Sequence, residues 1–295
     1  MRHSEGVVTW SGGRTWYEST GEGRDGRLPL VLLHGGPGAT HASLESLREL
    51  AQYGRRVVLY DQIGCGKSDH PSDPAFYTVQ RFVDELDALR AHLGLTRVHL
   101  LGHSWGGMLA MEYALTQPAG LESMIVADSP AGMPLWVAEA NRLRADLPAD
   151  VRSTLERHEA EGTTSDPAYF AAVDVFYRRH LCRLDPWPEA LERTAQAIAA
   201  DGFVYNLMNG PSEFHCIGTL RDWDITDRLP EIVTPTLLLS GRYDEATPTI
   251  VGAINERIAC SEWILFEQSS HMPQFEEPAA FQAAVRAFLA GIERR

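Results

Sequence analysis

The stretch that decides the fold is RVHLLGHSWG at residues 97–106, a short apolar run that leads into the pentapeptide Gly-His-Ser-Trp-Gly. Apolar spacing over Met108 to Leu115 predicts a helix directly after it, so the pentapeptide lies on a strand-to-helix turn. Such a turn lifts a serine out of the sheet and needs the small residues Gly102 and Gly106 on either side. Ser104 is therefore a candidate nucleophile, and an ordinary turn rich in small residues is the alternative.

Length and composition narrow the classes of protein. The chain has 295 residues, 44% of them hydrophobic, which suits one large soluble α/β domain with an insertion. Its 26 basic and 40 acidic residues give a net charge of −14, which argues against nucleic acid or an anionic membrane as partner. The N-terminus lacks an apolar leader and no run of 18 apolar residues occurs, so a cytoplasmic location is expected.

Three zones follow one another along the chain. Residues 1–128 and 225–295 alternate short apolar runs with helical periodicity, which predicts a mostly parallel central sheet with helices on both faces. Residues 129–224 carry only helical spacing and predict an inserted helical cap. The expected strands are Val7–Trp10, Thr15–Ser19, Leu30–Leu33, Val57–Tyr60, Val98–Leu101, Met124–Ala127, Leu237–Ser240 and Trp263–Phe266. The expected helices are Phe82–Leu93, Met108–Leu115, Leu135–Ala145, Pro167–His180, Pro188–Ala200, Ile250–Ile258 and Pro278–Leu289.

A serine nucleophile needs a base and an orienting acid, which this kind of fold supplies in the chain order serine, acid, histidine. Asp244 and His271 each lie in a loop directly after an apolar strand of the third zone. His271 would take the proton of Ser104 and return it to the leaving group, while Asp244 would fix the tautomer of the imidazole. The alternative for Asp244 is a turn or helix cap. His103 adjoins the serine, but neighbouring side chains diverge on this turn, so we expect it to pack or hydrogen-bond locally.

An oxyanion hole is the remaining component. HGGPG at residues 34–38 follows an expected strand, and its glycines let backbone N–H groups approach a substrate oxygen. We expect the N–H groups of Gly36 and Trp105 to form the hole. A flexible turn is the alternative, whereas the fingerprints of phosphate-binding loops are missing from the sequence. The four cysteines, Cys65, Cys182, Cys216 and Cys260, form no C-x-x-C pair, so we expect ordinary thiols and neither a zinc site nor a disulfide framework. Acylation and deacylation of Ser104 by the triad imply no metal or organic cofactor.

Several segments together resemble one family. HGGPG at 34–38, DQIGCGKS at 61–68 and GHSWGG at 102–107 resemble the proline iminopeptidase family of α/β-hydrolases. In the insertion, YNLMNGPSEF at 205–214 and GTLRDWDI at 218–225 are similar to the cap of the tricorn-interacting aminopeptidase branch, which includes L-amino-acid amidases.

The resemblance implies an α/β-hydrolase fold with a helical cap and hydrolysis of the bond after a free N-terminal residue. It also implies that Glu213 and Glu245 hold the substrate ammonium, a task for which partly desolvated carboxylates are suited. The expected partner is a small molecule or short peptide with a free amino terminus. Ile63 stands where the commoner family motif has Arg, so strict proline preference is not implied.

Two other functions stay open at this point. An esterase, lactonase or other acyl hydrolase of a biosynthetic or catabolic pathway would keep the same triad and turn the cap to another substrate. A ligand-binding receptor is the least favoured, because a complete triad and oxyanion loop are present. Epoxide hydrolases and dehalogenases need a carboxylate where this chain has Ser104.

Overall fold

The central feature of the fold is an eight-stranded sheet, seen in a computed structural model that describes residues 2–24 and 26–294. The strand order is β1-β2-β4-β3-β5-β6-β7-β8. Strand β2 pairs antiparallel with both β1 and β4, and all other neighbours run parallel. The strands are β1 (His3–Trp10), β2 (Gly13–Thr20), β3 (Leu30–Leu33), β4 (Val57–Tyr60), β5 (Val98–His103), β6 (Leu121–Ala127), β7 (Thr236–Gly241) and β8 (Ser261–Phe266). The predicted mostly parallel sheet is confirmed.

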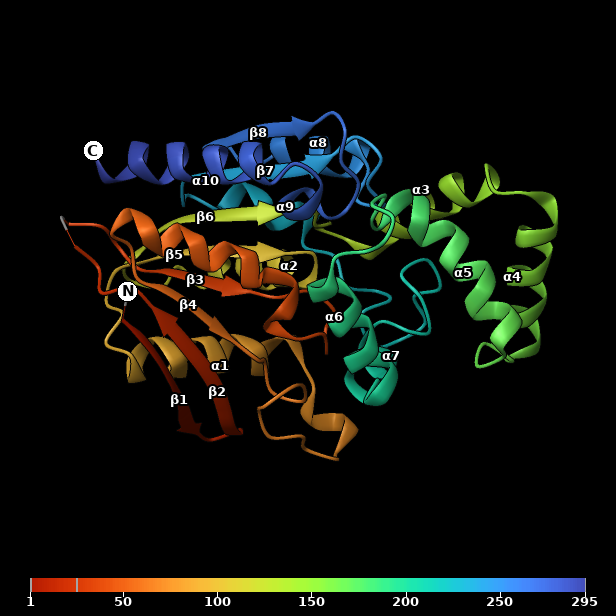
Figure 1. The fold of residues 1–295 in the computed structure, drawn as a ribbon, viewed down its shortest axis with the longest axis horizontal. Coiled ribbons are helices and arrows are strands. Elements are labelled where there is room, and N and C mark those ends of the chain that lie inside the picture. Colours follow the sequence, from red (N-terminus) through yellow and green to blue (C-terminus); the bar gives the residue numbers. More distant parts are fainter. Residues whose placement is uncertain (1, 25, 295) are drawn as a thin grey trace.

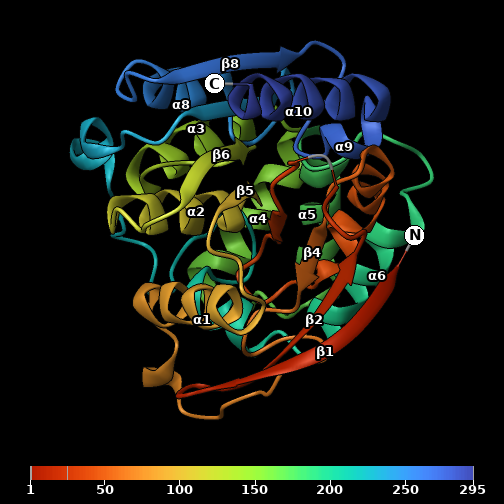
Figure 2. The ribbon, with the colours of Figure 1, turned by 90° about the vertical axis from the view of Figure 1, so that its left-hand side faces the viewer.

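Helices cover both faces of this sheet (Figure 2). Buried residues of α1 (Val79–His92), α2 (Trp105–Leu115) and α8 (Pro248–Asn255) share one apolar core with one face of the strands. Residues of the 3-10 segment η1 (His41–Tyr53) and of α10 (Pro278–Glu293) form a second core on the other face. In β3, Val31 and Leu33 enter the first core while Leu30 and Leu32 enter the second, as the alternation of side chains along a strand requires.

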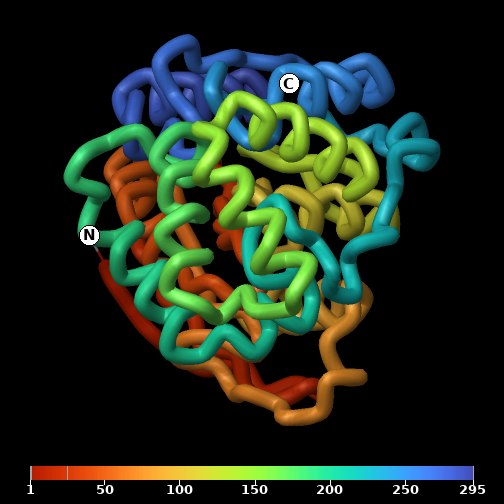
Figure 3. The backbone as a smooth tube through the Cα atoms, turned by 90° about the vertical axis from the view of Figure 1, so that its right-hand side faces the viewer, coloured from red at the N-terminus to blue at the C-terminus, as the bar shows by residue number. Residues whose placement is uncertain are grey.

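Five helices separate β6 from β7 in the chain and gather beyond the carboxyl ends of the parallel strands (Figures 1 and 3). They are α3 (Met133–Ala145), α4 (Ala149–Glu161), α5 (Pro167–His180), α6 (Glu189–Ala200) and α7 (Phe203–Met208). Leu155, Phe176 and Phe214 belong to an apolar cluster of their own within this segment. We call these five helices the cap.

The two ends of the cap segment lie side by side. Gly132 and Asp224 form an isolated antiparallel bridge, and the N–H of Ile225 donates to the carbonyl of Ala131 at 2.9 Å. Residues 131–132 and 224–225 thus lie close to the predicted limits of the cap, 129 and 224. The division into domains at these limits stays a prediction. The shorter elements η2 (Pro74–Phe76), η3 (Thr226–Glu231) and α9 (Pro273–Glu276) complete the list. None of the helices in the described residues is both long and apolar enough to cross a membrane.

Candidate active site

Ser104 lies at the turn between β5 and α2 with φ 55° and ψ −123°, a left-handed conformation that non-glycine residues rarely adopt. A Cβ on Gly102 would come within 2.0 Å of the carbonyl oxygen of Gly106. A Cβ on Gly106 would come equally close, at 2.0 Å, to the carbonyl oxygen of Leu33. The two glycines are therefore fixed by close backbone approach, and the turn directs Ser104 into a cavity of about 660 Å³.

Asp244 and His271 meet at the same edge of the sheet, in the loops after β7 and β8. The Nδ1–H of His271 donates to Asp244 Oδ1 at 2.7 Å, and both side chains are buried. The N–H of Ala246 donates to the same carboxylate oxygen at 2.8 Å. Burial alone raises the pKa of Asp244, but His271 and these hydrogen bonds outweigh it and hold that pKa below its ordinary value. His271 lines the 660 Å³ cavity together with Ser104, so the three residues are brought together.

His103 has a longer-range contact than the sequence suggested. Its Nε2–H donates to the backbone carbonyl of His271 at 2.8 Å, 168 residues away in the chain. The ring is buried and packs against that of His271, so the expected packing is present, but the hydrogen bond is not local in the sequence. Burial, with the neighbouring His271, lowers the pKa of His103 to about 3. A neutral imidazole with one N–H therefore supports the backbone of His271.

The glycine loop after β3 passes directly beside Ser104. A Cβ on Gly35 would lie 3.3 Å from Ser104 Cβ, and Gly36 has φ +117°. Gly36, Ser104 and Trp105 line a second, small cavity of about 20 Å³. Trp105 is the first residue of α2, where backbone N–H groups lack a partner within the helix. The two predicted oxyanion donors thus belong to segments that meet at Ser104, and their role stays a prediction.

Gln62 connects these two segments. Its Nε2 donates to the carbonyl of His34 at 3.0 Å, and its Oε1 accepts from the indole Nε1–H of Trp105 at 2.8 Å. The N–H of Gln62 donates to His34 Nε2 at 3.0 Å, while His34 Nδ1 lies 2.8 Å from the carbonyl of Gly35. Gln62 is fully buried, so all three hydrogen bonds are shielded from water.

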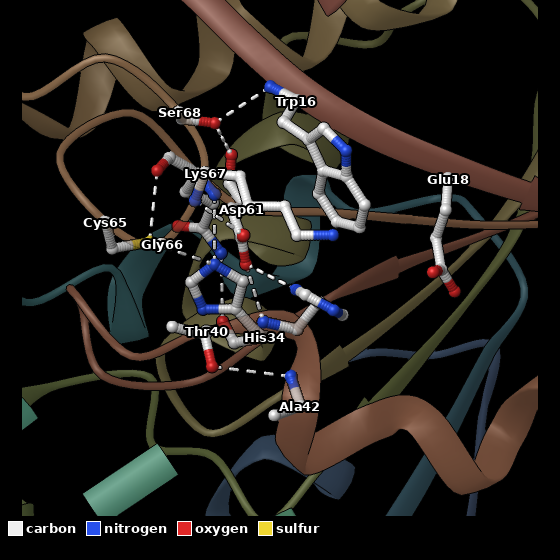
Figure 4. A network of polar contacts seen from close by, with 12 residues as sticks. Trp16, Glu18, His34, Thr40, Ala42, Asp61, Cys65, Gly66, Lys67 and Ser68 are labelled. Atoms are coloured by element: carbon white, nitrogen blue, oxygen red, sulfur yellow. Dashed lines mark hydrogen bonds and ion pairs between the residues drawn. The ribbon is translucent and has the colours of Figure 1, made fainter. Parts of the chain in front are cut away.

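Figure 4 shows the polar contacts between the glycine loop after β3, the loop after β4 and neighbouring residues of β2. Donor atoms of His34, Asp61 and Cys65 lie within 4.8 Å of one another, a spacing that suits a metal ion. Hydrogen bonds already engage them, because His34 Nε2 accepts from Gln62 and Asp61 accepts from His41 Nδ1 at 2.7 Å and from the N–H of Lys67 at 3.0 Å. Burial lowers the pKa of His34 to about 4, which keeps the ring neutral in this arrangement. We interpret the cluster as a structural support for the glycine loop.

Glu213 lies in the cap segment and lines both cavities beside Ser104. The hydroxyl of Tyr205 donates to Glu213 Oε1 at 2.6 Å. The backbone of Glu213 is held by Trp136, whose indole N–H donates to its carbonyl at 2.6 Å, and by Tyr177, whose hydroxyl accepts from its N–H at 3.2 Å. Burial raises the pKa of Glu213, and the Tyr205 hydroxyl and His271 counteract part of that rise.

Glu245 is fully buried, and neither of its carboxylate oxygens has a hydrogen-bond partner among the described residues. Its Oε1 lies 3.9 Å from His271 Nε2. Burial, followed by the charges of Glu213 and Asp244, raises the pKa of Glu245 well above its ordinary value. The charge of Glu213 thus raises the pKa of Glu245, and both carboxyl groups lie next to the triad. An unpaired buried carboxylate is costly, so this arrangement favours a cationic ligand.

The cap contacts the triad loops directly. The carbonyl of His180, the last residue of α5, accepts from the N–H of His271 at 3.2 Å. The Nδ1 of His180 lies 2.8 Å from the carbonyl of Tyr243, the residue before Asp244, and donates to it. The end of α5 therefore holds the loops of both the acid and the base.

Comparison with known proteins identifies the family of this chain. Residues 29–278 match the family described as the alpha/beta hydrolase fold. The proline iminopeptidase of Heyndrickxia coagulans is 41% identical over 98% of this chain and 100% of its own length. The chain belongs to the proline iminopeptidase family of α/β-hydrolases. The crystal structure of the family's Mycobacterium smegmatis member has a TM-score of 0.92 at 43% identity, covering 98% of this chain and 99% of that one. The crystal structure of VinJ has a TM-score of 0.95 at 46% identity with the same coverage, 98% and 99%.

The predicted fold class and family are thereby confirmed, whereas Gln62 and Tyr205 were not predicted as site residues. Both lie inside the segments that carried the family resemblance, 61–68 and 205–214. Their hydrogen bonds reach distant segments, so the local pattern of the sequence contains no signal for their partners. Position within a family motif was the only available signal.

Proposed function

We propose that the protein is a serine aminopeptidase or amino-acid amidase that releases the N-terminal residue of substrates with a free amine. The family membership supports peptide or aminoacyl amide hydrolysis. In this proposal Ser104 is the nucleophile, His271 the base and Asp244 the residue that orients the base.

The chemistry follows from the positions of these groups. His271 accepts the proton of Ser104 as the hydroxyl attacks the carbonyl, and the N–H groups of Gly36 and Trp105 stabilise the oxyanion. His271 then protonates the leaving amine, which departs on the side of the larger cavity that His271 lines. Water, deprotonated by His271, hydrolyses the acyl-enzyme and releases the amino acid.

The observation that carries the proposal is the pair of carboxyl groups beside the triad. Glu245 is buried, and neither of its oxygens has a partner in the described part of the chain, while Glu213 is oriented by the Tyr205 hydroxyl. A substrate ammonium would neutralise this pair and supply the missing hydrogen bonds. N-acetylation removes the charge and adds bulk, so a blocked substrate would leave Glu245 buried and unpaired.

The test compares chromogenic aminoacyl amides with their N-acetylated forms. We expect the wild-type kcat/KM to fall by about 10⁴-fold on acetylation, the discrimination typical of sites that bond a substrate group in a buried pocket. Glu213→Gln and Glu245→Gln should each lose most of this discrimination. Glu262→Gln, an exposed carboxylate on β8, is the matched control and should keep it.

Equal rates on free and blocked amides would remove amine recognition from the proposal. A higher kcat/KM on esters without any amine than on free-amine amides, unaffected by Glu213→Gln, would favour the esterase or lactonase alternative. Full activity of Ser104→Ala would contradict the acyl-enzyme itself.

A further inference from the structure

A second buried carboxyl group lies behind Asp244. Asp128 is the residue after β6, is fully buried, and has φ 55°, a strained conformation for a residue other than glycine. Its N–H donates to the carbonyl of Leu239 at 2.8 Å, and its Oδ1 accepts from the N–H of Gly241 at 3.3 Å. Gly241 also joins this segment to Asp244, because its carbonyl accepts from the N–H of Asp244 at 3.4 Å, and the two carboxyl groups are close enough for each to shift the pKa of the other. Asp128 is therefore fixed between the carboxyl ends of β6 and β7.

The close approach of the carboxyl groups of Asp128 and Asp244 requires that one of them carry a proton. Asp128 Oδ2 and Asp244 Oδ2 are both buried, and neither has a donor from the rest of the described chain. Two adjacent buried carboxylates repel each other, but one carboxyl O–H can donate to the other carboxylate. A shared proton thus satisfies two oxygens that otherwise have no partner.

The surroundings decide which residue holds the proton. Asp244 accepts from His271 Nδ1 and the N–H of Ala246, which stabilise its charge. Within residues 2–24 and 26–294, the side chain of Asp128 accepts a hydrogen bond only from the N–H of Gly241. His103 Nε2 lies 3.9 Å from Asp128 Oδ2 but donates to the His271 carbonyl. Burial and the charge of Asp244 raise the pKa of Asp128 well above its ordinary value. Asp128 is the neutral member.

We propose that Asp128 is a positioning residue for the triad, whose carboxyl O–H donates to Asp244 Oδ2 and fixes the plane of that carboxylate toward His271. The inference rests on the proposed role of Asp244 and His271. With this hydrogen bond, both oxygens of Asp244 are anchored, one by His271 and Ala246 and the other by Asp128. Without it, the carboxylate can rotate and the imidazole loses its fixed orientation.

The test uses variants that separate the donor from the charge. Asp128→Asn keeps an N–H donor for Asp244 and an oxygen for Gly241, so kcat should stay within about threefold of wild type. Asp128→Ala removes the donor, and kcat should fall by about 10- to 100-fold with little change in KM. Asp128→Gly does the same and accepts the positive φ without strain, so it tests the proposal if the alanine variant does not fold. Ser129→Ala removes a neighbouring buried hydroxyl and is the control.

Two readouts make the result independent of amine recognition. Kinetics are measured with p-nitrophenyl acetate as well as a free-amine amide, so failure of the ammonium site leaves the triad test intact. The downfield proton resonance of His271 Nδ1–H should persist in Asp128→Asn and shift or broaden in Asp128→Gly. A loss in Asp128→Asn as large as in the truncations, or wild-type behaviour of both truncations, would overturn the proposal.

Discussion

The Gln62 side chain offers the most direct test of how the oxyanion loop is held. Gln62→Met keeps the length of the side chain and removes its donor and acceptor. The indole N–H of Trp105 loses its 2.8 Å acceptor and the His34 carbonyl loses its 3.0 Å donor, both in the buried interior. Each unsatisfied buried group costs about 1–3 kcal/mol, so we expect a loss of about 2–6 kcal/mol in the free energy of unfolding.

The catalytic effect should exceed what the loss of stability explains. Removal of an oxyanion donor costs about 2.7–4 kcal/mol of transition-state stabilisation. Gln62→Met displaces the donors without removing them, so its cost should be smaller. We therefore expect kcat to fall by about 10- to 100-fold with KM nearly unchanged, because a shift of about 1 Å at the reacting centre can cost 10²-fold. Thermal unfolding and steady-state kinetics on an aminoacyl amide measure the two effects. Gln80→Met, an exposed position on α1, is the control. A Gln62→Met enzyme with wild-type kcat and melting temperature would refute the reasoning.

Three further predictions concern packing and pH. Gly106→Ala should fail to give folded protein, as judged by circular dichroism, because its Cβ would lie 2.0 Å from the Leu33 carbonyl; a folded, active variant would contradict the close approach. Burial by itself raises the pKa of Glu293, but His99, whose Nε2 lies 3.5 Å from Glu293 Oε1, and hydrogen bonds from Arg55 and the N–H of Leu28 lower it to about 2. Its folded pKa lies below the ordinary 4.5, so Glu293→Gln should lower stability at neutral pH, and urea titrations should show the difference vanishing as pH falls from about 4.5 to about 2. Burial also raises the pKa of Glu245 well above its ordinary 4.5, so the KM for free-amine substrates should fall as pH rises through this raised pKa and the carboxyl group becomes charged; a flat profile in the wild type, or an unchanged one in Glu245→Gln, would argue against binding of the ammonium by Glu245.

Much of the sheet could be predicted from sequence, because buried parallel strands form short apolar runs between turn residues. Leu30–Leu33 and Val57–Tyr60 match β3 and β4 at both ends. In the cap, Pro167–His180 matches α5 because Pro and paired aromatic residues mark its limits. Helix α4 was not predicted, since only Leu155 and His158 of its thirteen residues are buried and charged residues dominate the segment.

The candidate site divides in the same way. Ser104, Asp244 and His271 were found because each follows an apolar strand, and the carboxyl ends of parallel strands meet at one edge. Asp128 also follows an apolar strand, so it and Asp244 are both candidates for the triad acid. Only the pairing of β6 with β7 shows that the two side chains lie close together. The packing of η1 on the sheet through Leu44, Leu47, Leu50 and Ala51, and the bridge through Gln62, depend on contacts between distant segments, which local periodicity does not encode.

The attachment of α5 to the triad loops has a consequence for how new specificities arise in this chain. His180 binds the backbone beside both Asp244 and His271, so α5 is part of the frame of the catalytic machinery and also a wall of the substrate cavity. We expect that exchanging the whole cap for that of a relative would remove the two hydrogen bonds of His180. The loops of Asp244 and His271 would then be misplaced, whatever the substrate. Exchange limited to α6 and α7 would leave both hydrogen bonds of His180 in place. Recombination in evolution or in the laboratory is thus expected to succeed with cut points after α5, which ends at His180, and to fail with cut points inside α5.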